Sequence, residues 1–251
     1  MKQPLILGLL LACSFSFAGV CDRGRIGELI AESFNKTCDN VSDKDLQELR
    51  ILSLFEGQIT EIPPNAFHGM TSLEEIDLRR NKISKIPATA LQGLTSLGWL
   101  DMRENVISEI PPTAFLGLSS LHSLSLDANE IREIPAIALK GLTSLQLLSL
   151  DGNQIGHLQA GAFQDLTALE TLYLGNNKIG PIHPQAFQGL TSLNFLYLNN
   201  NEIREIPSQA FRPMISLWGI RIWDNHIDFI SKKASGLSPT CFDVDGVRLI
   251  D

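Results

Sequence analysis

The segment LGWLDMRENVISEIPPTAFLGL, residues 97–118, contains the pattern that decides the fold. It begins L-x-x-L-x-M-x-x-N-x-I, with apolar residues at positions 1, 4 and 6 and mostly polar residues between them. This arrangement predicts a short strand with one buried face. The remainder contains Ile-Pro and Ala-Phe-x-Gly-Leu, which predict a turn fixed by proline and a short helical turn that ends at glycine.

The same pattern recurs along the chain at a constant spacing of 24 residues, without an insertion. One such unit cannot bury its apolar face alone, so neighbouring units must stack to form a continuous core. A constant period of this length therefore predicts a solenoid. Its eight copies begin at Leu49, Leu73, Leu97, Leu121, Leu145, Leu169, Leu193 and Leu217.

The ninth position of the repeat is asparagine in every copy except the first, which has Gly57. At this position the chain leaves the strand, and an inward amide can both donate to and accept from the turning backbone. We therefore expect the asparagines at this position to be buried and to hold the fold. They are Asn81, Asn105, Asn129, Asn153, Asn177, Asn201 and Asn225.

The second half of the repeat predicts the convex side of the solenoid. A proline follows isoleucine in most copies, but Gln159 and His183 replace it, which predicts a local change in the convex turn without loss of the fold. Phenylalanine recurs at one position and predicts an aromatic row, interrupted by Leu91 and Leu139. The residues of this row are Phe67, Phe115, Phe163, Phe187 and Phe211.

These repeats resemble the extracellular leucine-rich-repeat family of the 24-residue type, over roughly residues 46–230. The resemblance implies an α/β solenoid that is curved, with short parallel strands on its concave face and turns and short helical segments on its convex face. It also implies a protein that binds a partner and does not catalyse a reaction. The fold alone does not identify the ligand.

Residues 1–18 have the pattern of a signal peptide. Lys2 precedes a short apolar run, and Ser-Phe-Ala at residues 16–18 gives the small-x-small pattern of a cleavage site. Alternatively, the lipobox-like Leu-Leu-Ala-Cys would lead to lipidation of Cys13, which would become the new N-terminus. Both routes predict an extracytoplasmic protein, secreted or, if bacterial, periplasmic or at the cell surface. No later apolar run reaches the ~20 residues that a membrane span needs.

Residues 19–48 are expected to form an N-terminal cap over the first repeat. An exported chain favours disulfides, and Cys21 and Cys38 are close in sequence, so we expect them to pair. The layout resembles the N-terminal cap of secreted bacterial leucine-rich-repeat proteins. Four apolar residues at helical spacing predict an amphipathic helix within the cap: Ile26, Leu29, Ile30 and Phe34.

The period ends after residue 230, and residues 231–251 are expected to form a C-terminal cap. The segment CFDVDGVRLID contains Asp-Gly and predicts a small hairpin over the last strand edge. Cys241 has no expected partner within the chain and is either free or available to another chain. The predicted organisation is a signal peptide at 1–18, a helical cap at 19–48, eight repeats at 49–230 and a C-terminal cap at 231–251.

Composition and motifs argue against several classes of function. A formal net charge of -8 does not suit a nucleic-acid binder, which needs a basic stripe against the phosphates. The five histidines show no metal-ligand spacing, and the chain lacks a phosphate loop and a His-Glu-x-x-His sequence. No serine has a base marked beside it. We therefore expect no catalytic site, no cofactor and no metal site.

Two pairs of aspartates keep one question about calcium open. Asp77 and Asp101 share position 5 of adjacent repeats, and Asp127 and Asp151 share position 7. Carboxylates on neighbouring strands would lie about 5 Å apart, close enough to share a calcium ion. The preferred interpretation is that nearby arginines neutralise the first pair and that the second pair is solvated.

Positions 2, 3, 5, 7 and 8 of each repeat are expected to project from the concave face. All three tryptophans and both tyrosines fall at these positions, and these residue types are enriched at binding hot spots. Strands favour aromatic residues, but that preference does not explain why no tryptophan or tyrosine occupies a core position. We expect the binding surface to include Trp99, Arg103, Asp127, Asp151, Tyr173, Phe195, Tyr197, Asn199, Trp218, Arg221 and Trp223.

These features predict a non-catalytic recognition module, secreted or envelope-associated, that binds a protein partner through its concave face. Charge complementarity would act in the N-terminal half and aromatic anchors in the C-terminal half. We expect this module to be a monomer. Two alternatives remain open: a structural envelope or matrix protein that associates with itself, for instance through Cys241, and a glycan-binding adhesin.

Overall fold

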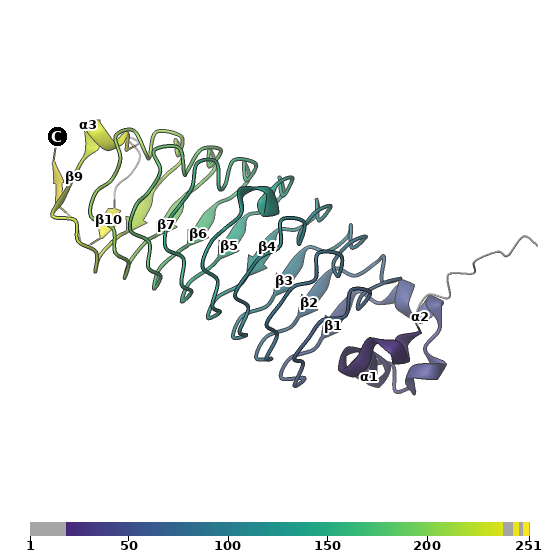
Figure 1. Cartoon of the computed structure of the whole chain (residues 1–251). Coiled ribbons are helices and arrows are strands. Elements are labelled where there is room, and N and C mark those ends of the chain that lie inside the picture. The colour runs from purple at the N-terminus through teal and green to yellow at the C-terminus, as the bar shows by residue number, and fades with distance from the viewer. Residues whose placement is uncertain (1–18, 238–242, 246–247, 251) are drawn as a thin grey trace, which may run out of the picture.

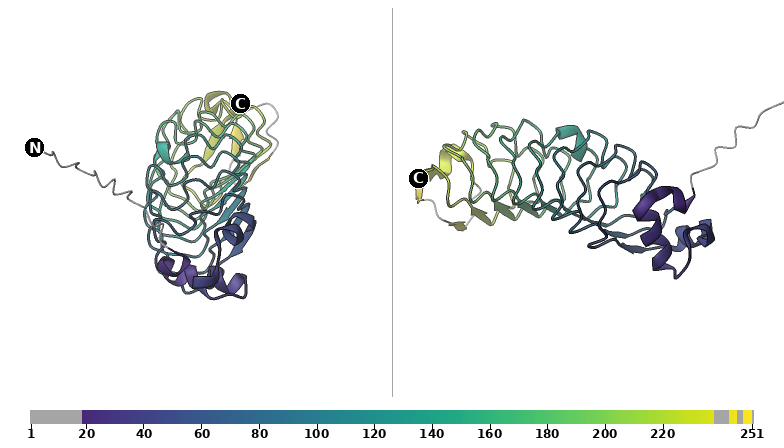
Figure 2. Two further views of the ribbon diagram at one scale, coloured as in Figure 1. Left: turned by 90° about the vertical axis from the view of Figure 1, so that its right-hand side faces the viewer. Right: turned by 60° about the horizontal axis from the view of Figure 1, so that its bottom comes forward.

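The computed structural model describes residues 19–237, 243–245 and 248–250. Eight three-residue strands recur along the chain and lie side by side in one parallel sheet, which β10 extends beyond β8. Figure 1 shows this row of strands running along an elongated stack, and Figure 2 shows its curvature from two further sides. The strands are β1 (Ile51–Ser53), β2 (Glu75–Asp77), β3 (Trp99–Asp101), β4 (Ser123–Ser125), β5 (Leu147–Ser149), β6 (Thr171–Tyr173), β7 (Phe195–Tyr197), β8 (Gly219–Arg221) and β10 (Asp243–Asp245).

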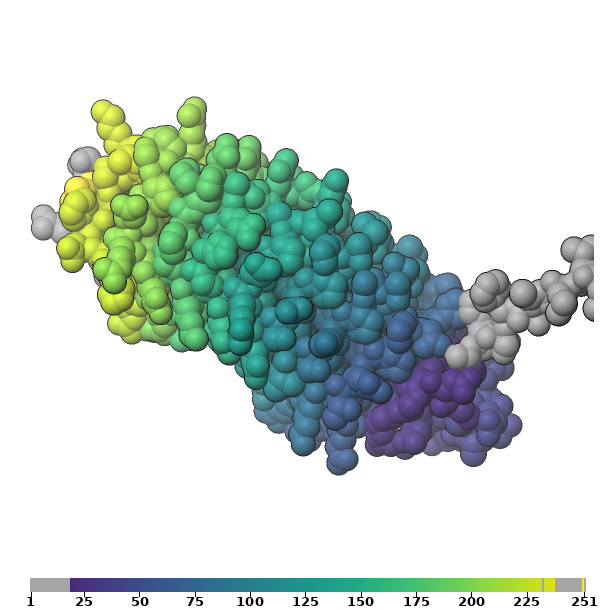
Figure 3. Space-filling view, in the orientation of Figure 1, coloured from purple at the N-terminus to yellow at the C-terminus, as the bar shows by residue number. Residues whose placement is uncertain are grey.

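Equal repeat positions face each other across the sheet. Leu52 pairs with Ile76, Ile76 pairs with Leu100, and the same register continues to β8. The colours in Figure 3 change steadily along the stack, so sequence neighbours are also neighbours in space. The α/β solenoid predicted from the period is confirmed, and each repeat position forms a continuous row along the curved molecule.

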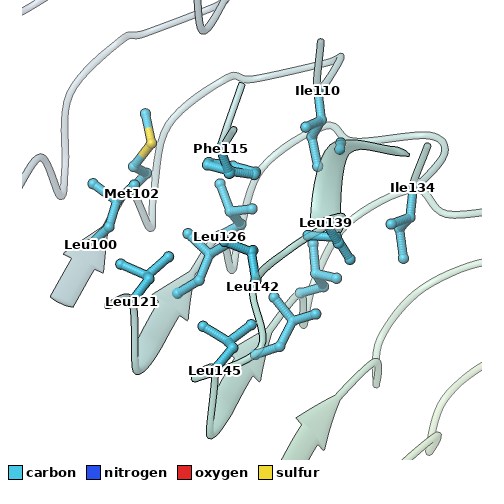
Figure 4. Close-up of a cluster of buried hydrophobic side chains, with 14 of the residues drawn as sticks. Leu100, Met102, Ile110, Phe115, Leu121, Leu126, Ile134, Leu139, Leu142 and Leu145 are labelled. Atoms are coloured by element: carbon cyan, nitrogen blue, oxygen red, sulfur yellow. The ribbon is translucent and has the colours of Figure 1, made fainter. Parts of the chain in front are cut away.

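The core is one continuous apolar column. Leu97, Leu100 and Met102, at positions 1, 4 and 6 of the third repeat, are each 0% exposed. The equivalent residues of the other repeats are also buried, except for the partly buried Leu49 at the N-terminal end. Figure 4 shows part of this column, where strand leucines pack against residues of the convex side such as Phe115. Each fully buried side chain of this size stabilises the fold by about 2 kcal/mol.

The ninth-position asparagines form a ladder of buried amides, as expected. Asn153 Nδ2 donates to the carbonyl oxygens of Leu126 and Leu150 at 3.0 Å, and Asn153 Oδ1 accepts from the Ile131 N–H at 3.0 Å. Each amide therefore joins two neighbouring repeats. The other six asparagines make the equivalent bonds, and Asn225 at the end of the row is only half-buried.

The residue before each ladder position has a left-handed backbone. Asn200, for example, has φ 54°, and Gly152 has φ 66°. This conformation turns the chain out of the strand, and asparagine and glycine adopt it more readily than most residues. The complete set at position 8 is Glu56, Arg80, Glu104, Ala128, Gly152, Asn176, Asn200 and Asp224.

The convex side contains the predicted phenylalanine row and glycine-ended turns. The rings of Phe163 and Phe187 stack at 6.4 Å between centroids, and those of Phe187 and Phe211 at 6.0 Å. Gly117 has φ 88°, which closes its turn in a conformation that a side chain disfavours. Most of these turns are too short to count as helices, and η3 (Ala136–Leu139) is the regular one among the described residues of the repeats.

The expected local change at Gln159 and His183 is confirmed. Leu158 and Ile182 form an isolated parallel bridge outside the strands of the main sheet. The His183 N–H donates to the Leu158 carbonyl at 3.0 Å, and the Leu158 N–H donates to the Pro181 carbonyl at 3.4 Å. A proline at position 183 could not make the first bond because it lacks an N–H.

Four helical segments lie at the N-terminal end of the stack: η1 (Val20–Arg23), α1 (Gly24–Ser33), η2 (Cys38–Asn40) and α2 (Asp43–Glu48). In the predicted amphipathic helix α1, Ile26 and Ile30 join the apolar core, and Leu29 and Phe34 pack against it. The expected disulfide links Cys21 and Cys38. Helix α2 was not expected from the sequence, and its first turn is capped by Ser42, whose side chain accepts the Asp45 N–H at 3.2 Å.

Contact with α1 explains why the first repeat lacks the ladder asparagine. A Cβ atom on Gly57 would lie 2.6 Å from Leu29 Cδ1 and 3.1 Å from the Leu54 carbonyl oxygen. A larger residue would therefore press against the helix that covers the core. The Gly57 carbonyl accepts a bond from Arg25 Nε at 3.2 Å, which ties α1 to the first repeat.

The prediction of a C-terminal Asp-Gly hairpin is wrong. β10 pairs in parallel with β8, and β11 (Arg248–Ile250) pairs in parallel with β9 (Phe229–Ser231). The two short strands therefore join different sheets instead of each other. After β9 the chain also contains α3 (Lys232–Ser235). The free edge of β8 takes β10 as a parallel partner, in the same register as the other strands of the sheet. This pairing replaces the local hairpin turn that Asp-Gly favours.

The predicted signal peptide, the lipidation site Cys13 and the unpaired Cys241 lie outside the described residues. The boundaries at 18, 48 and 230 therefore stay predictions. Within the described part of the chain, no helix has both the length and the apolar composition that crossing a bilayer requires.

Candidate functional site

The concave sheet face has a depression of about 690 Å³ across β3, β4, β5 and β6, which we call the central basin. Ser123, Ser125 and Ser149 lie between two aromatic residues, Trp99 on β3 and Tyr173 on β6. Small side chains between large ones leave the space that forms the basin. The remaining lining residues are Asp101, Arg103, Glu104, Asp127, Ala128, Leu147 and Asp151.

The strand register explains how residues distant in sequence reach one basin. Trp99 pairs with Ser123, and Ser123 with Leu147, in the row formed by position 3. Ser125, Ser149 and Tyr173 lie in the row formed by position 5. Five of the predicted binding residues line the basin together: Trp99, Arg103, Asp127, Asp151 and Tyr173.

An ion-pair network borders the basin on its N-terminal side. Arg79 donates from Nε and Nη2 to the two carboxylate oxygens of Asp77, at 2.9 and 2.6 Å. Arg103 donates to the two oxygens of Asp101 in the same way. Arg79 Nε also lies 3.7 Å from Asp101, which is 0% exposed on its side chain. The arginines thus neutralise this aspartate pair, as the preferred interpretation held, and Asp101 lies beneath them instead of at the surface.

Asp127 and Asp151 have a different environment, and the expectation of simple solvation is wrong for both. Asp127 Oδ1 accepts the Asp151 N–H at 3.0 Å and the Ser149 hydroxyl. Asp151 Oδ1 accepts the Gly175 N–H at 2.6 Å. Each carboxylate thus receives the backbone N–H at position 7 of the next repeat, where the strand pairing ends. Burial of this region leaves both carboxylates partly shielded from water.

The pKa values of Asp127 and Asp151 are shifted in the opposite direction from that of Asp77, for a physical reason. Burial raises the pKa of Asp127 and of Asp151, and the hydrogen bonds that they accept only partly offset this effect. Burial also acts to raise the pKa of Asp77, but the bonds from Arg79 outweigh it and hold that pKa below its ordinary value. Among the described residues, Asp127 has only the distant Arg103 as a cation, at 4.0 Å, and Asp151 has no ion pair.

Aromatic residues continue from the basin toward the C-terminal end. The Tyr173 and Tyr197 rings stack at 4.4 Å between centroids, and Phe195 meets Trp218 edge to face at 6.0 Å. Trp218 is 56% exposed and Phe195 is 38% exposed. These residues form a second group beside the basin, and Tyr173 belongs to both groups.

The remaining predicted binding residues lie farther along the same face. Arg221 and Trp223 are exposed on the last repeat, at or just after β8. Asn199 is only 9% exposed, and a Cβ atom on Gly175 would meet its amide at 2.9 Å. Asn199 therefore offers little surface to a partner and packs against the neighbouring repeat.

Two residues on this face, Phe55 and Ser149, were missed in the sequence analysis. Phe55 lies under the guanidinium groups of Arg79 and Arg80, at 5.3 and 5.6 Å from its ring centroid. The Ser149 hydroxyl donates a hydrogen bond to Asp127 Oδ1 and orients that carboxylate. The available signal was the row of position-7 residues, Phe55, Arg79, Arg103, Asp127 and Asp151, which combines one aromatic residue, two cations and two anions.

The described residues bring together one group of three metal-ligand atoms within 4.8 Å of one another, at Cys21, Cys38 and Asp39. The two sulfur atoms of this group form the disulfide, so it is not a metal site. The aspartates of the basin do not form such a group.

A family model for the leucine rich repeat matches residues 47–107, 103–155 and 148–203. The chain belongs to the leucine-rich repeat family. Solenoids of this family typically mediate recognition and binding, and they are generally non-catalytic. A comparison with curated proteins gives no match.

Solved structures similar to this chain include two internalins from Listeria monocytogenes. Internalin C2 is 25% identical with a TM-score of 0.69, over 91% of this chain and 93% of that chain. A second internalin is 28% identical with a TM-score of 0.64, over 80% of this chain and 55% of that chain. TLR13 from a TLR13–ssRNA13 complex is 29% identical with a TM-score of 0.71, over 75% of this chain but only 27% of the TLR13 chain.

Proposed function

We propose that this leucine-rich-repeat protein is a recognition module that binds a protein partner through its concave face. The observation that carries the proposal is the central basin, where the aromatic residues Trp99 and Tyr173 flank a floor of small polar side chains. Tryptophan and tyrosine contribute much of the binding energy at protein interfaces because they bury large areas with few rotatable bonds. A depression between them admits side chains of a partner.

Charge on the same face favours a protein over a nucleic acid. Five carboxylates share three guanidinium groups in the network beside the basin. The residual negative charge would repel phosphates, although a similar structure, TLR13, is found in a complex with ssRNA. A partner surface with a basic region complements this charge.

The export of the protein is part of the same proposal. Residues 1–18 read as a signal peptide, and the Cys21–Cys38 disulfide suits an oxidising compartment. The mass of the protein recovered from its native source tests the route of export. Cleavage after Ala18 gives a chain that begins at Gly19, whereas lipidation gives a chain that begins at Cys13 with added acyl mass.

The test of binding compares the wild type with a Trp99→Ala/Tyr173→Ala variant. Immobilised protein is exposed to extracts of candidate target surfaces, and partners that bind the wild type are quantified on both proteins. Loss of Trp99 and Tyr173 should weaken binding by about 2 kcal/mol or more if they are anchors. Leu116→Ala/Ile137→Ala is the matched control, because both residues are exposed apolar side chains on the convex side. Equal binding by the wild type and the basin variant would refute the proposal.

Glycan binding is a second candidate, supported by the aromatic pair beside the basin. Tyr173 and Tyr197 stack on each other, and the same two repeats also carry Asn176 and Asn200, whose amides bond to each other at 2.8 Å. Aromatic faces and amide groups suit the apolar faces and hydroxyls of a sugar. Binding to a glycan array that Tyr197→Ala abolishes, with no captured protein, would favour this candidate over a protein partner.

A further inference from the structure

The central basin carries more negative charge than the cations around it balance. The arginines of the network end at Arg103, whereas carboxylates continue to Asp127 and Asp151 on the next two repeats. Within the described residues, Asp151 has no ion pair and Asp127 has one at the limit of 4.0 Å. The C-terminal part of the basin therefore has two carboxylates that lack a close cation.

The Oδ2 atoms of these carboxylates have only long contacts. Oδ1 of each accepts a backbone N–H of the next repeat. Oδ2 of Asp127 faces only Arg103 at 4.0 Å, and Oδ2 of Asp151 accepts only the Asn176 amide at 3.4 Å. The bonds at Oδ1 thus hold the two carboxylates in place, while each Oδ2 retains capacity to accept a further donor.

Aromatic residues on both sides suit a cationic side chain with an apolar stem. Trp99 and Tyr173 lie three strands apart, roughly 14 Å, so a short segment of a partner fits between them and places one side chain at the carboxylates. The first repeat shows this chemistry within the chain, because Phe55 lies 5.3 and 5.6 Å from the guanidinium groups of Arg79 and Arg80. Aromatic rings attract cations through their negative faces, and arginine also stacks on them.

We propose that the central basin binds an arginine or lysine side chain on a loop of the protein partner, with Asp127 and Asp151 accepting its donors and Trp99 and Tyr173 contacting the flanking residues. This inference rests on the proposed function and specifies the chemistry of the partner. Burial raises the pKa of both carboxyls, and a cation placed there restores the ionised form. A metal ion is the weaker occupant, since no third carboxylate joins the pair.

The experiment uses short blocked peptides in place of the unidentified partner. Acetyl-Gly-Arg-Gly-amide and its lysine, norleucine and glutamate counterparts are titrated into the full protein with ¹⁵N-labelled tryptophan. The indole N–H signal of Trp99 is assigned by its loss in Trp99→Phe. We expect a saturable shift of this signal with the arginine and lysine peptides at millimolar concentration. The norleucine and glutamate peptides should produce no saturable shift.

Three variants test the carboxylates. Asp127→Asn and Asp151→Asn retain an oxygen that can accept the backbone N–H, so both should fold, which thermal unfolding checks. Each should raise the dissociation constant of the arginine peptide by about tenfold, since a hydrogen bond to a charged group contributes about 1.5 kcal/mol or more. Glu170→Gln is the matched control, because Glu170 is an exposed carboxylate on the same face outside the basin, and it should bind as the wild type does.

Three results would overturn the inference: equal binding of the norleucine peptide, wild-type binding by both aspartate variants, or the same saturable shift with calcium alone. Its failure is distinguishable from failure of the proposed function. If no peptide binds but the Trp99→Ala/Tyr173→Ala variant loses a protein partner, the proposed function stands without a basic side chain in the basin. If the arginine peptide binds through Asp151 but captured proteins ignore the basin, the proposed function fails.

Discussion

At the scale of single residues, the consecutive asparagines Asn199, Asn200 and Asn201 have three different environments. Asn201 belongs to the buried ladder and bonds to backbone groups of two repeats, at Ile179 and Leu174 in one and at Leu198 in the other. Asn200 has the left-handed backbone of position 8, and its amide donates to Asn176. Asn199 packs against Gly175. The repeat position of each residue, more than its type, decides what its amide does.

The ladder predicts a measurable cost for removing one buried amide. Asn153→Ala leaves the Leu126 and Leu150 carbonyls and the Ile131 N–H without this partner. We expect a loss of about 1–3 kcal/mol in the free energy of unfolding, measured by urea denaturation. Asn225→Ala is the comparison, because the same bonds are lost at a half-buried position where water can replace them. Equal losses for the two variants would contradict this explanation.

Asp127 and Asp151 predict a specific dependence of stability on pH. Burial raises the pKa of both above the ordinary value of 3.8, so between that value and the raised one the folded chain holds more protons than the unfolded chain. Their contribution to stability is therefore present at low pH and decreases as the pH rises through this window. Asp45 and Asp77, whose pKa values are lowered, act in the opposite direction in every variant.

The measurement compares urea midpoints of the wild type and Asp127→Asn/Asp151→Asn across the acidic range. Subtracting the two curves cancels the contributions of carboxylates common to both proteins. The wild type should lose stability relative to the variant as the pH rises above the ordinary value. A difference that stays constant with pH, or changes in the opposite direction, would show that these carboxyls titrate normally.

At the scale of elements, backbone hydrogen bonds close each turn of the solenoid. Their pattern depends on which residue occupies position 15 of the repeat. In most repeats a proline at position 15 sets the turn, and in the sixth repeat His183 replaces it. The His183 N–H then joins the bridge between Leu158 and Ile182. The convex side of the fifth and sixth repeats is therefore tied by a contact that a proline would remove.

A consensus proline normally rigidifies its turn and would be expected to stabilise the protein. At position 183 we expect the opposite because of the bridge. His183→Pro should lower the free energy of unfolding by about 1 kcal/mol, because it leaves the Leu158 carbonyl without the His183 N–H. Gln159→Pro is the matched control at the same position of the fifth repeat. It interrupts neither of the two bonds of the bridge and should change stability less. A stabilised His183→Pro variant would show that the rigidity of proline outweighs the bond.

At the scale of the whole molecule, a stack of repeats must have both of its ends covered. Helix α1 and the Cys21–Cys38 disulfide lie at one end, and β10 and β11 at the other. A strand that pairs in parallel with β8 continues the sheet by one position, so β8 itself is not the open edge. The curved face between the ends is continuous and contains the basin.

Removing the C-terminal strands should expose the edge of β8. A variant that ends at residue 237 loses β10 and β11, so we expect faster amide hydrogen exchange in β8 and self-association on a sizing column. Exchange in β3 and β4, far from this end, should stay as in the full chain. Cys241→Ser in the full chain is the control for loss of that cysteine. An unchanged exchange rate in β8 would mean that β10 does not protect this edge.

Much of the fold could be predicted because residues at equal repeat positions become neighbours in space. The pattern within one repeat therefore specifies the contacts between repeats. Leu97 and Leu100 are buried for the same reason in every copy, and the asparagine ladder follows from a single position. The C-terminal pairing could not be predicted, since Asp-Gly favours a local hairpin and only the position of the free edge of β8 selects parallel pairing. The burial of the Asp101 and Asp127 side chains likewise depends on which neighbouring residues cover them, and the sequence does not show this.

The sequence by itself determined the solenoid, its core rows and the face on which tryptophan and tyrosine lie, because a constant period fixes which positions stack. Only the tertiary structure decided which surface residues act together. Trp99 and Tyr173 share one basin because three serines between them leave it open, and Asp101 is buried because Arg79 and Arg103 close over it. Such contacts depend on side-chain sizes and charges across several repeats, which no single repeat contains.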